Sequence, residues 1–481
     1  MEGKGKNFYI STALPYVNYA PHAGFALEII QADVIARYHR ILGDDVFFLT
    51  GTDENSLKNV KAAEEEGISV KKLVDRNAKK FYDLKKILNL SFDDFVRTTE
   101  KRHIKGAQKL WLACKKDIYK KIYRGLYCIG CEAFYKESEL ENGLCPEHQT
   151  KPELVEEENY FFKLSKYQNQ LRKIIENDEV KIIPETRKNE ALSFIKSGLE
   201  DICISRSVER AKGWGIPVPG DLSQITWCWF DALSNYINAL GYGENDKKFQ
   251  EWWQKNENKT HIIGKGILRF HGIYWSAILL SAKLALPKTI FVHGYLTSGG
   301  QKMSKSLGNV IDPFELVKKY GTDAVRYFLL REILPTEDGD FTYEKFEARY
   351  NADLASGLGN LVARVITLAE KSKIPAFAKA TAGKQNSKII KNTWDRYKKA
   401  LDEFRFNEAL IAVWGLISFC DRYIEKERPW EESENQKEVI SNLLLALSEI
   451  AKLLEPFLPE TSEEIFKQLK TKKSQPLFPR I

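Results

Sequence analysis

A strand–loop–helix–strand pattern near the N-terminus restricts the fold of this chain more than any other feature. Residues 8–14 are apolar and β-rich, and residues 45–50 form a second apolar run of strand length. Between them, apolar residues recur on one face of a helical period, and Gly43 supplies a suitable C-cap. The recurring residues are Leu27, Ile30, Val34, Tyr38 and Ile41. This order predicts the first turn of a doubly wound parallel sheet.

The loop of this unit has the composition of a phosphate-binding turn. His22 and Gly24 fall at the predicted helix N-terminus, where unpaired backbone N–H groups and the positive end of the helix dipole attract anions. Gly24 would let a nucleotide approach the backbone closely. Alternatively, Gly24 serves only the turn geometry and His22 only caps the helix. These residues alone leave both interpretations open.

A second phosphate-binding pattern lies far along the chain, at residues 302–306 (KMSKS). Lys302 and Lys305 place two ammonium groups around small hydroxyl side chains. Such a loop can close on a polyphosphate and stabilise the charge that develops when its α–β bond breaks. Because Lys/Ser loops are common, the pentapeptide is weak evidence by itself. Combined with the His22 segment, it favours one nucleotide site built from two distant segments.

These two segments resemble the His-x-Gly-His and Lys-Met-Ser-Lys-Ser signatures of the class I aminoacyl-tRNA synthetases. Further blocks, in the family's order, narrow the resemblance to the methionyl-tRNA synthetase family. They are residues 13–18 (ALPYVN), 50–54 (TGTDE), 214–219 (WGIPVP) and 229–236 (WFDALSNY). The resemblance covers essentially the whole chain. It implies an α/β fold class: a doubly wound, Rossmann-like parallel sheet with an inserted zinc-knuckle module and a C-terminal all-α helix bundle.

The expected domains follow the chain in order. They are the first half of the nucleotide-binding catalytic domain (1–115), the inserted connective module with the knuckle (116–225), the second half of the catalytic domain (226–290), the KMSKS loop and connecting region (291–345), and the helical anticodon-binding domain (346–481). The apolar residues Leu354, Leu358, Leu361, Val365 and Leu368 predict a bundle seam. Residues 374–387 read as a low-complexity linker. Thr461 and Glu464 predict a capping box that opens the last helix.

One cysteine cluster has metal-ligand spacing. Two Cys-x-x-Cys/His pairs, separated by thirteen residues, supply three thiolates and one imidazole, which suits tetrahedral Zn²⁺. The ligands would be Cys128, Cys131, Cys145 and His148. The alternative is four unbound side chains in a reduced loop. Because all four positions are protein ligands, we expect a single structural Zn²⁺ rather than a catalytic one.

The resemblance implies activation of L-methionine by ATP, with Mg²⁺, and transfer of the methionyl group to methionine tRNA. The implied catalytic residues are His22, Lys302 and Lys305. The implied ATP-binding residues are His22, Gly24, Phe25, Gly264, Lys265, Lys302, Ser304 and Lys305. Because the substrate carboxylate is already ionised at neutral pH, the protein must mainly position the reactants and stabilise phosphoryl charge.

The resemblance also implies an amino-acid pocket and an anticodon-reading surface. Asp53 would accept the substrate ammonium. The other methionine-binding residues would be Ala13, Leu14, Tyr16, Trp229, Ala232, Leu233, Tyr236, Ile267 and His271. For any one aromatic residue among them, plain core packing is the competing interpretation. Asn360, Arg364 and Trp430 would read the anticodon, by base-edge contacts and by stacking.

Several positions depart from the family pattern. Phe25 replaces the second His of the first signature, Asn55 and Ser56 replace a His-Gly pair, and Gly266 stands where Asp is common. Phe25 and Gly266 favour one alternative, a degenerate paralogue that binds tRNA without making adenylate. The intact Lys302, Lys305, His22 and Asp53 argue against it. A class I enzyme for another aliphatic amino acid or for cysteine is the other alternative.

Composition sets broader limits. The 73 Lys and Arg residues exceed the 66 Asp and Glu residues, so that the formal net charge is +7, which is compatible with a polyanionic partner but does not prove one. Scattered cysteines argue against a disulfide framework. No signal-peptide core or long apolar run is present, so we expect a cytoplasmic protein without a membrane span. Because the chain stops soon after the helix bundle, we expect a monomer.

Overall fold

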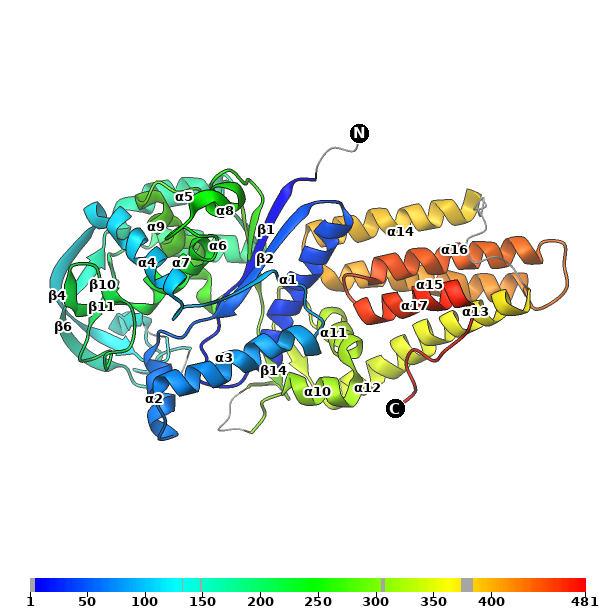
Figure 1. Cartoon of the computed structure of the whole chain (residues 1–481), viewed down its shortest axis with the longest axis horizontal. Helices are drawn as coiled ribbons and strands as arrows, with labels where there is room; N and C mark the ends of the chain where they lie inside the picture. Colours follow the sequence, from blue (N-terminus) through cyan, green and yellow to red (C-terminus); the bar gives the residue numbers. More distant parts are fainter. Residues whose placement is uncertain (1–4, 132, 148, 304–307, 373–383) are drawn as a thin grey trace. The chain divides into compact units, whose positions relative to one another are not determined.

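The computed structural model describes residues 5–131, 133–147, 149–303, 308–372 and 384–481, drawn as ribbon in Figure 1. The chain divides into two compact units. Unit 1 contains the described residues up to Pro21, together with His39–Lys85 and Ser91–His293. Unit 2 contains His22–Tyr38, Lys86–Leu90 and the described residues from Gly294 to Ile481.

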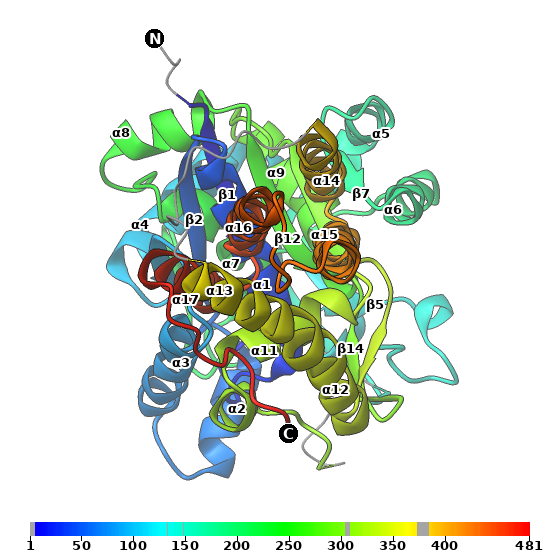
Figure 2. The ribbon, with the colours of Figure 1, turned by 90° about the vertical axis from the view of Figure 1, so that its right-hand side faces the viewer.

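Unit 1 is built around a six-stranded parallel sheet, which confirms the Rossmann-like prediction (Figure 2). The strand order is β3-β2-β1-β12-β13-β7, and each neighbouring pair is parallel. The strands are β1 (Asn7–Thr12), β2 (Asp45–Thr52), β3 (Asp94–Arg97), β7 (Lys181–Ile183), β12 (Lys259–Gly264) and β13 (Thr289–His293). The central strands β1, β2 and β12 are buried along almost their whole length, which explains why their sequences do not alternate between apolar and polar residues.

Helices of unit 1 accompany this sheet. They are α2 (Leu57–Glu65), α3 (Val70–Ile87), α4 (Lys101–Ala113), α5 (Gln168–Glu176), α6 (Glu185–Lys196), α7 (Cys228–Asn238), α8 (Asp246–Phe249) and α9 (Ser276–Ser281). Helix α7 packs on α4 and is tied to the sheet by the Tyr9 hydroxyl, which donates to the Tyr236 carbonyl at 2.9 Å. Tyr9, Tyr236 and Trp253 all belong to the main apolar core of this unit.

The order of the strands produces a topological switch point at β1. Strand β1 lies between β2, the next strand in sequence, and β12, which begins at Lys259, far later in the chain. The chain therefore leaves β1 toward one side and returns on the other. Ligands of doubly wound sheets bind at this kind of switch point, outside the carboxyl ends of the strands.

A separate antiparallel sheet carries the cysteine cluster. Its order is β5-β4-β6-β8, with the long pair β4 (Ile118–Cys128) and β6 (Glu153–Phe162) at its centre. The outer strands are β5 (Ala133–Tyr135) and β8 (Ile202–Cys203), and a small sheet of β9 (Ser205–Ser207), β10 (Pro217–Val218) and β11 (Asp221–Thr226) follows. Strand β7 lies within the range predicted for the inserted module but pairs in the parallel sheet, so the module boundaries stay a prediction.

Unit 2 begins with helix α1 (Ala23–Ile41), most of which belongs to it, and ends in long packed helices (Figure 1). Its small sheet contains β14 (Leu296–Ser298), β15 (Gln301–Lys302) and β16 (Gly339–Phe341). Its further helices are α10 (Pro313–Tyr320), α11 (Thr322–Arg331), α12 (Tyr343–Arg349), α13 (Asn360–Lys371), α14 (Lys384–Asp402), α15 (Phe406–Glu427), α16 (Gln436–Leu454) and α17 (Pro459–Thr471). Helix α16 packs against α13, α15 and α17, as expected for a bundle.

Three local predictions about the bundle need correction. The last helix begins at Pro459, so that Thr461 lies inside its first turn and opens no capping box. Pro at the first helical position needs no N–H partner, and Asp323 from α11 accepts the Thr461 N–H at 2.6 Å instead. Helix α14 already begins at Lys384, inside the predicted linker, whereas residues 373–383 lie outside the described part. In the predicted seam, Leu368 is only half-buried, while its other members are buried.

A buried ion pair joins the segments of unit 2. Arg326 of α11 and Asp33 of α1 are both fully buried, with Nη2 2.8 Å from the carboxylate. The same guanidinium donates to the carbonyls of Leu88, Pro456 and Phe457 at 2.7–3.0 Å. One side chain therefore fixes α1, α11, the short segment at residues 86–90 and the corner between α16 and α17.

Replacing Arg326 by Met should lower the free energy of unfolding by about 3 kcal/mol, because the buried Asp33 would keep Arg37 but lose Arg326, and three backbone carbonyls would lose their donor. Urea denaturation followed by circular dichroism would measure the change. The exposed Lys318→Met variant on α10 is the control and should stay within about 0.5 kcal/mol of the parent chain. An Arg326→Met variant as stable as the control would contradict this role for the pair.

Candidate active site

His22 caps helix α1 and keeps a donor available. Its carbonyl accepts the N–H groups of Phe25 and Ala26 at 3.0 and 3.1 Å, and its Nδ1 accepts the Gly24 N–H at 3.0 Å. Because Nδ1 is an acceptor, the neutral ring carries its proton on Nε2. The exposed imidazole therefore offers an N–H group of the kind that binds a phosphate oxygen.

The described parts of the two signature segments, around Gly24 and Met303, lie side by side in unit 2. A Cβ atom at Gly24 would lie 2.8 and 2.9 Å from His22 ring atoms and 3.8 Å from the Met303 methyl group. The Ala23 N–H donates to the Ile311 carbonyl at 2.9 Å, so that the start of α1 is bonded to the segment that follows the KMSKS residues. Glycine at position 24 is thus required by the imidazole that folds over it.

A short hairpin presents Lys302. Strands β14 and β15 are joined at Gly299 and Gly300, whose φ angles of +60° and +75° suit the tight turn. Asp340 accepts the Gly300 N–H at 2.7 Å and so anchors the turn, and the Lys302 side chain is exposed. Ser304 and Lys305 lie outside the described residues, and their roles stay predictions.

The predicted amino-acid pocket gathers at the carboxyl ends of the central strands of unit 1. Ala13, Leu14 and Tyr16 follow β1, Asp53 follows β2, and Gly264, Lys265 and Ile267 lie at the end of β12. Helix α7 contributes residues spaced by three and four positions, which share one face. These are Trp229, Ala232, Leu233 and Tyr236. Most of the apolar members lie in or against the main core, whereas Tyr16 packs in a separate cluster with Leu57 and Trp227.

Two polar side chains of this predicted pocket, Tyr236 and His271, are linked by a hydrogen bond. The Tyr236 hydroxyl lies 2.8 Å from His271 Nε2, and His271 Nδ1 lies 3.0 Å from the Ile267 carbonyl. A carbonyl only accepts, so Nδ1 carries the proton and the Tyr236 hydroxyl donates to Nε2. Burial lowers the pKa of His271 to about 4, which keeps the ring neutral at physiological pH. A neutral pair of this kind suits an uncharged thioether.

An aromatic stack forms one wall of the same region. The Trp229 indole and the Phe270 ring are parallel, with centroids 3.7 Å apart and an interplanar angle of 2°. Phe270 was absent from the sequence-based set, although it is adjacent to His271. Phe270 and His271 lie in the helical turn at Arg269–Trp275, so that a helical reading of that segment could have suggested Phe270.

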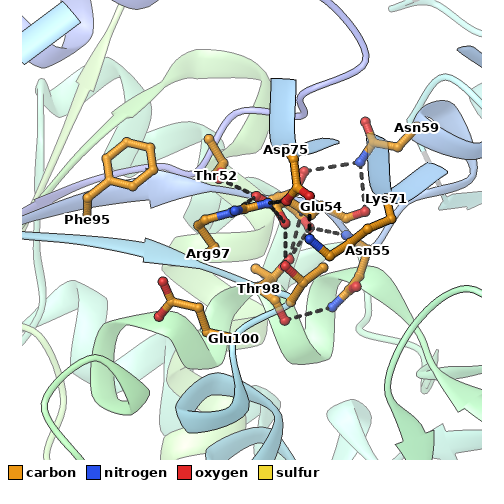
Figure 3. A network of polar contacts seen from close by, with 12 residues as sticks. Thr52, Glu54, Asn55, Asn59, Lys71, Asp75, Phe95, Arg97, Thr98 and Glu100 are labelled. Atoms are coloured by element: carbon orange, nitrogen blue, oxygen red, sulfur yellow. Dashed lines mark hydrogen bonds and ion pairs between the residues drawn. The ribbon is translucent and has the colours of Figure 1, made fainter. Parts of the chain in front are cut away.

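A polar network fixes the loop that carries Asp53 (Figure 3). Arg97 of β3 donates to both oxygens of the buried Glu54 carboxylate, at 2.6 and 3.0 Å, and to Asp75 at 2.6 Å. The Glu54 N–H donates to the Thr98 hydroxyl at 2.8 Å. Because Glu54 directly follows Asp53, this network holds the backbone that presents the predicted ammonium acceptor.

Asn55, one of the departures from the family pattern, has a structural role in this loop. Its amide donates to the Thr98 carbonyl at 3.1 Å and to Asp231 Oδ2 at 2.9 Å. Asp231 lies on α7, two residues after Trp229. Asn55 therefore connects the Asp53 loop to the helix that carries much of the predicted pocket.

The described part of the cysteine cluster fits a metal ion. The sulfur atoms of Cys128, Cys131 and Cys145 all lie within 4.8 Å of one another, and those of Cys131 and Cys145 are 3.4 Å apart. Tetrahedral Zn²⁺ with Zn–S bonds of about 2.3 Å separates sulfur atoms by roughly 3.8 Å. The cysteines are not disulfide-bonded. His148, the fourth predicted ligand, lies outside the described residues.

The predicted anticodon residues lie in unit 2. Asn360 begins helix α13 and is exposed, and Arg364 lies one turn further along the same helix. The Arg364 guanidinium pairs with Asp421 and Glu425 of α15. Trp430 follows Pro429 and leaves 49% of its surface exposed. These features suit stacking and edge contacts with unpaired bases, but the role in anticodon reading stays a prediction.

Comparison with known proteins decides the family. The model for tRNA synthetases class I (M) matches residues 8–151 and 138–366, and that for the anticodon-binding domain of tRNA ligase matches residues 388–479. A methionine–tRNA ligase of Brucella suis is 42% identical over 96% of this chain and 91% of its own length. The chain belongs to the methionyl-tRNA synthetase family.

Further relatives support the same family assignment. A methionine–tRNA ligase of Thermotoga maritima is 42% identical over 96% of this chain and 75% of its own length. Among solved structures, Mycobacterium tuberculosis methionyl-tRNA synthetase in complex with methionyl-adenylate superposes with a TM-score of 0.89 at 36% identity, covering 98% of this chain and 97% of that one. The family resemblance and fold class inferred from the sequence are therefore confirmed.

Among the described residues, no helix is long and apolar enough to cross a membrane.

Stability should fall in acid because His271 is buried as the neutral form. Below its ordinary pKa of 6.5, the unfolded chain binds a proton there that the folded chain does not, until about pH 4. The free energy of unfolding should therefore fall by on the order of 3 kcal/mol between pH 6.5 and pH 4 because of this one group. A His271→Gln variant should show a shallower pH dependence in urea titrations at several pH values, and an unchanged slope would contradict the assignment.

Proposed function

We propose that this chain is a methionine–tRNA ligase, which joins L-methionine to the 3′-terminal adenosine of methionine tRNA at the expense of ATP. The observation that carries the proposal is the juxtaposition of the two signature segments in unit 2. Gly24 lies against Met303, and the start of α1 is hydrogen-bonded to Ile311. This arrangement suits one triphosphate contacted by both segments, on a chain of the matching family.

In the first step, the methionine carboxylate attacks the α-phosphorus of ATP. A carboxylate oxygen–phosphorus bond forms, the bond to the β-phosphate oxygen breaks, and pyrophosphate leaves. No general base is needed, because the carboxylate is ionised at neutral pH. His22 Nε2–H, Lys302 and Lys305 would stabilise the charge on the phosphoryl oxygens. Mg²⁺ would enter with ATP as its phosphate complex.

In the second step, a ribose hydroxyl of the terminal adenosine attacks the carbonyl carbon of methionyl-adenylate, and AMP leaves. The ATP-binding role proposed for Gly264 and Lys265 rests on their place at the carboxyl end of β12. Phe25 is buried and adds no polar group there. Gly266 lies in the turn directly after Lys265 and likewise offers no side-chain ligand.

The methionine side chain would occupy the region bounded by Trp229, Leu233, Tyr236, Ile267 and His271. Aromatic faces suit a polarisable sulfur atom, and the neutral Tyr236–His271 pair offers polarity without charge. Asp53 would bind the substrate ammonium by a charge-assisted hydrogen bond. The Glu54–Arg97 network would keep that carboxylate in place.

We further propose that Cys128, Cys131, Cys145 and His148 hold one structural Zn²⁺, and that helices α13–α17 bind the anticodon arm through Asn360, Arg364 and Trp430. With no open ligand position, the metal would fold the knuckle and take no part in the chemistry. A cytoplasmic, monomeric enzyme is expected, and both properties stay predictions.

Pyrophosphate exchange into ATP should depend on methionine and on no other standard amino acid. Lys302→Ala should lower kcat/KM for exchange by about a hundredfold, because a cation that stabilises phosphoryl charge is lost. The exposed Lys318→Ala variant is the control and should behave as the parent chain. Exchange with a different amino acid alone would support another class I enzyme, and tRNA binding without any exchange would support the degenerate paralogue.

Zinc content tests the metal proposal separately. The purified chain should contain about one Zn²⁺ per molecule by elemental mass spectrometry. Cys145→Ser should lose the metal, whereas Cys420→Ser, which changes a buried cysteine in the helix bundle, should retain it. Full metal content in Cys145→Ser would exclude the proposed ligand set.

A further inference from the structure

One hydrogen bond connects the cysteine cluster to the predicted methionine pocket. The Trp229 indole Nε1–H donates to the backbone carbonyl of Cys131 at 3.3 Å. Cys131 also supplies one of the sulfur atoms of the cluster. A residue that would bind the metal through its side chain thus holds a pocket residue through its backbone.

The remaining contacts of Trp229 make this bond decisive for its orientation. The parallel stack on Phe270 fixes the plane of the indole, and His271 packs against it at nearly a right angle, with centroids 6.4 Å apart. A ring in a stack can still slide and rotate within its own plane. The N–H bond to the Cys131 carbonyl restricts that remaining freedom, because hydrogen bonds weaken steeply as they bend.

Tyr135 provides a second connection between the cysteine cluster and the Trp229–Phe270 stack. Its hydroxyl donates to the Cys131 sulfur at 2.9 Å. The guanidinium of Arg269 lies over the Tyr135 ring, 5.9 Å from its centroid, and Arg269 directly precedes Phe270. Both partners of the Trp229–Phe270 stack are therefore connected to the Cys131 turn, Trp229 by its N–H and Phe270 through its chain neighbour.

We propose that Cys131 is a positioning residue for the methionine pocket: its metal-bound turn orients Trp229, so that occupancy of the knuckle by Zn²⁺ and affinity for methionine are coupled. The inference rests on the proposed function, since it takes methionine as the ligand. Because metal ligation orders a small knuckle that lacks a sizeable core, removing the metal frees the Cys131 carbonyl to move. The indole then loses its acceptor, and the pocket loses a fixed wall.

Equilibrium dialysis with labelled L-methionine, without ATP, tests the coupling on the full chain. The Kd is measured for zinc-loaded protein, for protein stripped with a chelator, and after zinc is restored. Trp229→Phe keeps a ring for the stack but removes the N–H group. Trp253→Phe is the matched control, because Trp253 also donates its indole N–H to a backbone carbonyl, that of Ala285 at 2.8 Å, and it belongs to the same unit.

Stripping the metal should raise the Kd for methionine about fivefold or more in the parent chain and in Trp253→Phe. This is the effect of losing roughly one hydrogen bond. The affinity should recover when zinc is added back. Trp229→Phe should bind more weakly from the start and change little on stripping. Equal losses in all three proteins, or no loss in any, would overturn the proposal. A zinc-loaded parent chain that binds no methionine would instead contradict the proposed function.

Tyr135→Phe adds a test that leaves all four predicted ligands and the metal in place. It removes the hydroxyl bonded to the Cys131 sulfur, so it should weaken methionine binding in the parent chain but not in the Trp229→Phe background. Additive losses in the double variant would mean that Tyr135 acts independently of Trp229, and would also overturn the proposal.

Discussion

The arrangement of unit 2 depends on the Arg326–Asp33 pair. Taking two charges out of water is costly, and the pair is tolerated because the guanidinium is satisfied on every side by the carboxylate and three backbone carbonyls. A different packing of the surroundings would separate the guanidinium from these acceptors at a cost in free energy. The direction of α1, and with it the place of His22, is set by this requirement rather than by apolar packing alone.

In unit 1, neutral polar groups fix the packing around the predicted methionine pocket. Tyr236, His271 and the Ile267 carbonyl form a chain in which each donor has one acceptor, and burial keeps the imidazole uncharged. In the Asp53 loop, by contrast, charged groups face each other, and Arg97 compensates Glu54. The region predicted to hold both an ammonium group and a thioether thus has its charged and uncharged parts built by separate networks.

Features that repeat along the sequence could be predicted, whereas contacts between distant side chains could not. The apolar runs of β1 and β2 and the helical period of α1 identified the parallel sheet, because burial on both faces leaves a continuous apolar run. The capping of α17 by Asp323 was missed, since a residue 138 positions away supplies the acceptor. The Trp229–Phe270 stack and the Trp229–Cys131 bond were missed for the same reason. Family resemblance supplied a predicted composition for the pocket, which stays a prediction, but not the contacts among these residues.

The strand order also has a consequence for biosynthesis. β1 is the central partner of both β2 and β12, yet β12 begins only at Lys259 of a 481-residue chain. While the ribosome makes the intervening residues, one hydrogen-bonding edge of this apolar strand stays without its permanent neighbour. Unpaired strand edges promote aggregation, and completion of this sheet is therefore a late event in synthesis of the chain.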